Sequence, residues 1–138
     1  MMTRNDAYSL YMATLKIKSG ALPVGTMVKY IELREKLARF IEAFNSAKME
    51  MSLQTKPEGW KEGDDDTEWN KSYQALIKEY MKEAVDINPH ILTKDEVIQI
   101  YLANQDLPGD QLDYIKKMLT IEDEEPKTAK VKELNDNK

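Results

Sequence analysis

The chain has 138 residues, 33% of them charged and 41% hydrophobic, which suits one globular domain of ordinary size. It contains no cysteine and no run of about 18 apolar residues, which excludes a disulfide scaffold, a cysteine-based metal or redox site and an ordinary membrane-spanning helix. The first residues lack the apolar stretch of a signal peptide, so we expect a soluble, cytoplasmic protein that does not enter membranes.

The net charge of −5 is unevenly distributed along the chain. Residues 1–55 contain eight Lys and Arg against five Asp and Glu, whereas residues 56–138 contain twelve against twenty. Affinity for nucleic acid comes mainly from clustered Lys and Arg, so this acidic balance argues against a nucleic-acid binder. The basic residues between positions 16 and 39 are interleaved with glutamates, as is typical of a solvated, salt-bridged helix face.

The first predicted helix covers residues 3–19, where apolar residues recur every three or four positions. Thr3 and Asp6 have the spacing of a weak capping box. Gly20 suits the position just after the last turn.

The strongest periodic signal predicts a long helix over residues 27–54, with Thr26 as its N-cap. Its main apolar stripe steps by three and four residues across three heptads. The stripe consists of Tyr30, Leu33, Leu37, Phe40, Phe44, Ala47 and Met51. Ile31, Ala38 and Ile41 widen this face, which indicates packing on more than one side.

A third helix is predicted over residues 67–84, after a loop at 55–66 that is rich in Gly and Asp. Its aromatic and apolar residues again step by three and four positions. A flexible loop between two such helices predicts an antiparallel hairpin. We expect its buried contacts to involve Leu37, Phe40, Phe44, Tyr73, Leu76 and Tyr80.

The rest of the chain predicts short elements and a tail. Residues 85–88 alternate apolar and polar and suit either a short edge strand or extended chain. Thr93 and Glu96 form a capping box that opens a short helix, and a last short helix contains residues 112–119. The predicted fold is therefore all-α or nearly so, with one helical domain at 1–121 and a disordered charged tail at 122–138.

The sequence offers no catalytic or cofactor-binding motif. His90 is the only histidine and follows Pro89 in a polar connection, which favours a turn residue over a catalytic base. There is no Gly-x-Ser-x-Gly motif and no glycine-rich phosphate loop. We therefore expect a non-enzymatic protein without a cofactor.

The acidic run at residues 62–68 raises the question of a metal site. An EF-hand loop needs Gly at its sixth position and Glu at its twelfth, but counting from Asp64 these positions hold Trp69 and Ala75. Acidic residues before a helix are explained by the positive end of its macrodipole. We therefore predict no metal site.

Four segments within residues 8–119 share a recognisable layout: a charged stretch of the long helix at 30–37, a Gly/Asp loop at 63–66, an aromatic-led helix start at 69–73 and an extended acidic piece at 83–88. In this layout the chain resembles a family of small tailed-bacteriophage proteins of unknown function. The resemblance supplies no catalytic residues. It implies a phage-associated, non-enzymatic role as a virion component or an assembly factor, located in the host cytoplasm or the virion.

Two functions remain open from the sequence. The first is a phage structural or assembly protein that binds itself or another phage protein through the wide apolar face of residues 27–54, as a homo-oligomer. The candidate interface consists of Met27, Tyr30, Ile31, Ala38, Ile41, Ala47 and Met51. The alternative is an acidic regulatory or inhibitor protein that binds a host factor through residues 56–138.

Overall fold

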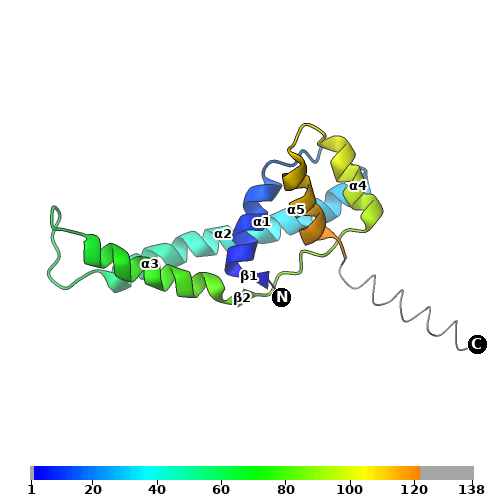
Figure 1. Cartoon of the computed structure of the whole chain (residues 1–138). Helices are drawn as coiled ribbons and strands as arrows, with labels where there is room; N and C mark the ends of the chain where they lie inside the picture. The colour runs from blue at the N-terminus through cyan, green and yellow to red at the C-terminus, as the bar shows by residue number, and fades with distance from the viewer. Residues whose placement is uncertain (1, 122–138) are drawn as a thin grey trace, which may run out of the picture. The chain divides into compact units, whose positions relative to one another are not determined.

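The computed structural model describes residues 2–121, so the predicted disordered tail at 122–138 lies outside the described residues. Almost all regular structure is helical, and the all-α prediction is confirmed (Figure 1). In chain order the elements are β1 (Met2–Thr3), α1 (Arg4–Thr14), α2 (Val24–Thr55), α3 (Thr67–Lys82), β2 (Ala84–Val85), α4 (Lys94–Ala103) and α5 (Gly109–Leu119).

The described chain divides into two compact units. Unit 1 contains residues 2–12 and 34–87, and unit 2 contains residues 13–33 and 88–121. Helix α2 contributes residues to both units, and the single domain at 1–121 stays a prediction.

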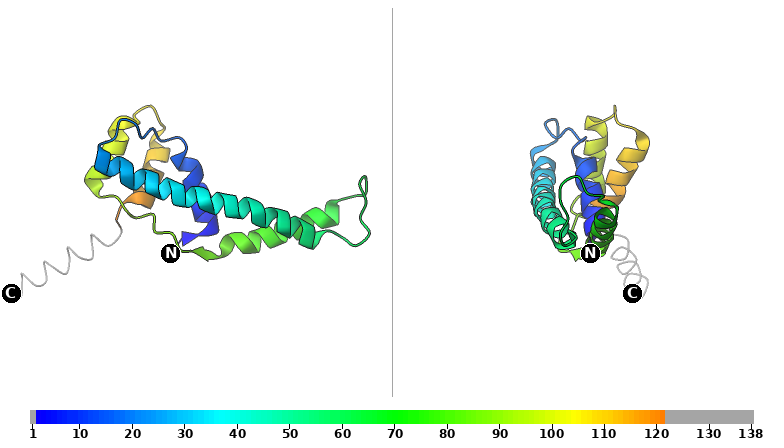
Figure 2. Two further views of the ribbon diagram at one scale, coloured as in Figure 1. Left: turned by 180° about the vertical axis from the view of Figure 1, so that it is seen from behind. Right: turned by 90° about the vertical axis from the view of Figure 1, so that its left-hand side faces the viewer.

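Unit 1 is built on the predicted helical hairpin, in which α3 lies beside the C-terminal part of α2 (Figure 2). Phe44 is the centre of its core. The Phe44 ring stacks on Phe40 at 6.1 Å and on Tyr80 at 5.7 Å, and meets the edge of Tyr8 at 6.0 Å. These ring contacts join α1, α2 and α3.

The predicted core residues of the hairpin are buried on α2 but not on α3. Leu37, Phe40 and Phe44 of α2 are buried as expected. No residue of α3 is buried, so the expectation was wrong for the α3 members of the set, of which Tyr73 and Leu76 are only half-buried. The spacing identifies the face that α3 turns toward a partner, but one neighbouring helix covers only part of such a face.

The hairpin loop is ordered by two consecutive turns. The Trp60 amide donates to the Pro57 carbonyl at 3.2 Å, and the Asp64 amide donates to the Lys61 carbonyl at 2.9 Å. The third residue of each turn is a glycine with positive φ, Gly59 at 78° and Gly63 at 96°. Glycine is the residue type that adopts this backbone conformation without steric cost.

Unit 1 contains a two-stranded antiparallel sheet, of which the sequence indicated one strand only as an option for residues 85–88. β1 pairs with β2, with Met2 opposite Val85. The capping box at the start of α1 is confirmed, since Asp6 N donates to the Thr3 hydroxyl at 3.1 Å and Thr3 N to the Asp6 carboxylate at 3.2 Å. A strand of two residues is too short to produce a visible alternation.

The first helix ends at Thr14 and not at residue 19, so Gly20 does not cap it. The chain turns at Lys18, whose backbone N–H and carbonyl both bind the side chain of Asn104. α2 then begins at Val24, before the predicted N-cap. Thr26 is instead a buried residue inside α2, and its hydroxyl donates to Gln99 Oε1 at 2.5 Å.

Unit 2 packs the N-terminal part of α2 with α4, α5 and the connections between them. Tyr30 is fully buried and its hydroxyl donates to the Thr14 carbonyl at 2.5 Å. The predicted capping box of α4 is present, with Thr93 and Glu96 satisfying each other's backbone amides. A parallel bridge joins Leu92 to Thr120 at the end of α5.

Candidate interaction surfaces

The N-terminal part of α2 has an apolar stripe on the face opposite its buried residues. Val24, Val28 and Ile31 are 74%, 47% and 37% exposed, and Met27 beside them is half-buried. These four residues, which we call the outward stripe, occupy positions i, i+3, i+4 and i+7. This spacing lines one side of a helix and is the pattern by which helices pack against a partner.

The structure divides the predicted interface residues into three groups. Tyr30 and Met51 belong to the core, at 0% and 7% exposure, and therefore leave the candidate interface. Ile31 is exposed. The remaining members are half-buried: Met27, Ala38, Ile41 and Ala47.

Val24 and Val28 are the members of the outward stripe that the sequence interpretation missed. They were missed because the strongest periodic signal, which starts at Tyr30, identifies the buried face of α2. The signal that could have found them is the second four-residue spacing, from Val24 to Val28, followed three positions later by Ile31.

Apolar side chains are also exposed at the other end of α2, and those of α3 are only partly covered. Met49 and Leu53, four residues apart on α2, are 71% and 65% exposed. On α3 the whole apolar face is half-buried, including Tyr73 and Leu76. Unit 1 therefore has partly uncovered apolar surface on both helices of the hairpin.

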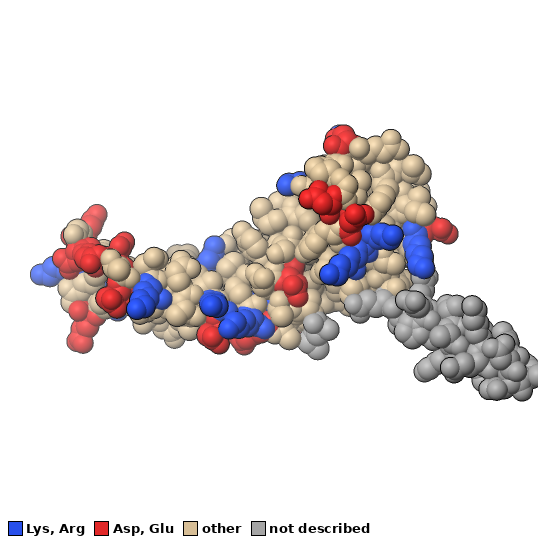
Figure 3. All heavy atoms as spheres, in the orientation of Figure 1, with Lys and Arg blue, Asp and Glu red and all other residues tan. Residues whose placement is uncertain are grey.

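The tip of the hairpin is acidic, as Figure 3 shows. Its carboxylates form local hydrogen bonds that need no metal: Asp64 accepts from Lys61 N at 2.8 Å, and Asp65 accepts from Thr67 N and the Thr67 hydroxyl. The bonds from Thr67 lower the pKa of Asp65. Within residues 2–121, no group of three or more His, Asp or Glu side chains is arranged to hold a metal ion.

A polar cluster joins α2 to α4 in unit 2. Lys29 Nζ lies 2.9 Å from the Glu96 carboxylate, and the Thr93 amide donates to the same carboxylate at 2.9 Å. Partial burial opposes the ionisation of Glu96, but the hydrogen bonds from Thr93 and the charge of Lys29 outweigh it and lower its pKa. Glu96 therefore carries its charge at neutral pH while it both caps α4 and holds α2.

His90 lies in the connection between β2 and α4, as the sequence indicated. Its amide donates to the Asn88 side chain at 3.1 Å, and its Nδ1 is 3.0 Å from the Thr120 carbonyl oxygen. The first contact orders the connection itself, and the second joins it to the end of α5, so His90 stabilises the local structure.

Among the described helices, none is both long enough and apolar enough to cross a membrane. No family model, no curated protein and no solved structure matches this chain.

Proposed function

We propose that this chain is a non-enzymatic structural or assembly protein of a tailed bacteriophage, either a virion component or an assembly factor. It acts through helix-mediated contacts with further copies of itself, with another phage protein, or with both, in the host cytoplasm or in the virion. The outward stripe of α2 is the observation that carries the proposal. The phage origin rests on the resemblance of residues 8–119, and the lack of a catalytic motif supports a binding role.

The outward stripe favours a second copy of the chain as its partner. Val24 and Val28 cost free energy while they are exposed to water, and burial against another apolar surface recovers it. Symmetric homo-oligomers are the commonest way to cover such a surface, because a two-fold axis places the same stripe on both sides of the interface. Structural and assembly proteins of virions work in the same repeated form.

Cross-linking tests this interface directly, because the chain has no cysteine of its own. Val28→Cys places one thiol in the outward stripe, and Lys36→Cys places one at an exposed position on another face of the same helix. We expect a short bis-maleimide reagent to give covalent dimers of Val28→Cys and few of Lys36→Cys. Equal yields from the two variants would count against the outward stripe as the interface.

The biological setting has its own test. Mass spectrometry of virions purified from the phage that encodes this chain should detect it in many copies if it is a structural component. An assembly factor would be detected in immature particles and absent from mature ones. Absence from both kinds of particle would contradict the proposal.

A specific observation favours one alternative, an acidic regulator that binds a host factor. The carboxylates of residues 62–68 are exposed at the hairpin tip (Figure 3). Among the residues that the structure describes, no group of three or more such side chains is arranged to hold a metal ion, so these carboxylates are available to a protein partner. This alternative expects the protein to capture a single host protein, and it expects the variant Glu62→Gln/Asp64→Asn/Glu68→Gln to lose it. The self-assembly proposal expects that variant to keep its oligomeric mass.

A further inference from the structure

A cavity of about 280 Å³ lies in unit 2, between α4 and the end of α5. This volume is close to the lower limit for ligand pockets, about 300 Å³. The lining residues are Lys94, Val97, Ile98, Tyr101, Lys116 and Thr120. None of them belongs to the outward stripe, so the cavity is independent of the proposed self-association.

The walls of the cavity are largely apolar and can contact one apolar side chain of a ligand. Val97 is buried and Ile98 is 53% exposed, so α4 presents aliphatic surface to the cavity. The Tyr101 hydroxyl donates to the Leu112 carbonyl at 2.9 Å, which fixes the ring against α5. Leu102, 65% exposed and next to Tyr101, extends the apolar surface of α4 beyond the cavity.

Two lysines stand at the rim, and within residues 2–121 neither forms an ion pair. Lys94 and Lys116 are both exposed. Lys116 is in the last turn of α5, where the macrodipole favours a cation, but Lys94 is in the first turn of α4, where it disfavours one. The positive charge of Lys94 therefore does not stabilise α4 through the helix macrodipole.

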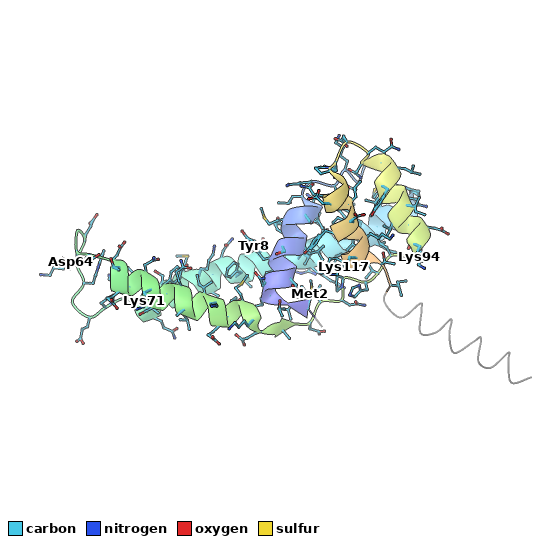
Figure 4. All side chains as sticks on the ribbon, in the orientation of Figure 1. Met2, Tyr8, Asp64, Lys71, Lys94 and Lys117 are labelled. Carbon is cyan, nitrogen blue, oxygen red and sulfur yellow. The ribbon has the colours of Figure 1, made fainter. Side chains whose placement is uncertain are left out.

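The charges beside the cavity are of both signs. Figure 4 labels Lys94 at the start of α4 and Lys117 in the last turn of α5, and Figure 3 shows acidic as well as basic side chains on this side of unit 2. The nearest acidic residues along the two helices are Asp95 and Asp113, and the Asp113 carboxylate lies 3.3 Å from the Tyr101 hydroxyl. In the described part of the chain, residues 2–121, Lys94 and Lys116 are nevertheless lining residues whose charge is not offset by an ion pair, so an anion at the cavity could pair with both.

We propose that the cavity is the docking site for an acidic segment of another protein. One large apolar side chain of that segment fills the space between Val97, Ile98 and Tyr101, and the carboxylates that flank it pair with Lys94 and Lys116. Charge complementarity and the apolar walls together define this partner. A free inorganic anion would leave the walls uncovered, and a purely apolar ligand would leave both lysines unpaired.

Fluorescence anisotropy of the full chain tests the assignment with three labelled peptides. The first is Glu-Glu-Leu-Phe-Glu-Glu, the second replaces Leu-Phe by Gly-Ser, and the third replaces every Glu by Lys. We expect saturable binding of the first peptide alone at micromolar to submillimolar protein. Lys94→Gln/Lys116→Gln should weaken it about fivefold, the loss expected for two partly exposed ion pairs.

The matched control is Lys71→Gln/Lys78→Gln, which removes the same charge from exposed positions of α3 and should leave the affinity unchanged. Ile98→Asp, at an exposed position, should abolish binding by placing a carboxylate in the wall without disturbing the core. Circular dichroism melting of each variant verifies that it is folded.

Three results would overturn the proposal. The first is equal binding of the Gly-Ser or the Lys peptide, and the second is an unchanged affinity in Lys94→Gln/Lys116→Gln. The third concerns this chain's own acidic residues at 122–125. If replacing those four by Gln or Asn tightens peptide binding, they compete for the cavity, and the occupant is not another protein.

Discussion

Asn104 is the polar side chain on which the loop at residues 15–23 depends. It is completely buried, its amide oxygen accepts from Lys18 N at 2.7 Å, and its NH₂ group donates to the carbonyls of Lys18 at 3.2 Å and Ile100 at 2.9 Å. The side chain thereby satisfies backbone groups of two segments that lie more than 80 residues apart. No local sequence pattern distinguishes it from an ordinary helix-end asparagine.

Asn104→Ala should therefore lower the free energy of unfolding by about 1–3 kcal/mol, the cost of leaving buried backbone groups unpaired. Chemical denaturation monitored by circular dichroism measures this change. Gln105→Ala alters an exposed neighbour and should have almost no effect. A similar effect of both variants would show that the contact between Asn104 and Lys18 does not stabilise the fold.

Phe40 tests the core of unit 1 at the level of one residue. It is 9% exposed and stacks on Phe44, so Phe40→Ala should cost about 3–5 kcal/mol. Tyr73→Ala on α3 should cost much less, because that ring is only half-buried. A loss below about 1 kcal/mol for Phe40→Ala would show that Phe40 is not a core residue.

Among the elements, α4 has the clearest pH dependence. The pKa of Glu96 is lowered in the folded protein, so its contribution to stability is complete above its unfolded pKa of about 4.3 and is lost as the pH falls through the folded value. Glu96→Gln keeps a capping side chain but removes the charge. Because the variant loses the ion pair with the partly exposed Lys29, it should be less stable than the wild type at pH 7 by up to about 1 kcal/mol.

Thermal melts of both proteins between pH 2 and pH 7 measure this difference, which should shrink below about pH 4. A difference that stays constant over this range would mean that the Glu96 charge contributes nothing through Lys29 or Thr93.

The loop between α2 and α3 should not respond to metal ions. Asp64 already accepts a hydrogen bond from Lys61 N, and Asp65 accepts two from Thr67, so we expect millimolar calcium to leave the thermal midpoint unchanged apart from a general salt effect. A saturable rise in the midpoint that disappears in Asp64→Asn/Asp66→Asn would reveal a metal site, since a ligand of the folded state must stabilise it.

Element positions followed from the sequence where the information is local. The spacing of α2 and the capping residues at Thr3 and Thr93 act within a few residues, and the structure shows the helix and the capping boxes that they predict. The Gly-rich and Asp-rich stretch predicted a loop, and the structure adds its two turns at Gly59 and Gly63. The predicted end of the first helix was wrong: α1 ends at Thr14, and the backbone of Lys18 beyond it binds a side chain distant in the sequence, that of Asn104.

Surfaces were harder to predict than elements. A three-to-four spacing marks a face of a helix, but it does not say how much of that face its neighbours cover. For this reason Tyr30 proved to be core while Val28, on the opposite side of α2, proved to be exposed. The half-burial of α3 likewise depends on how few elements pack against it.

At the scale of the whole molecule, both units leave apolar side chains uncovered. Unit 2 exposes Val24 and Val28, and unit 1 exposes Met49 and Leu53. Scattered apolar residues are normal on a protein surface, but a stripe at i, i+3, i+4 and i+7 is a contiguous patch and usually marks an interaction site. Self-association through the outward stripe is accordingly the central claim about this protein.

Light scattering coupled to size-exclusion chromatography, over a range of micromolar concentrations, tests that claim most directly. For the wild-type chain we predict the mass of a dimer or a larger closed ring, a multiple of 16.0 kDa. Val24→Glu/Val28→Glu, at exposed positions, should shift the mass toward 16.0 kDa without loss of folding. A wild-type mass of 16.0 kDa at every concentration would contradict self-assembly and favour a monomeric binder of a different protein.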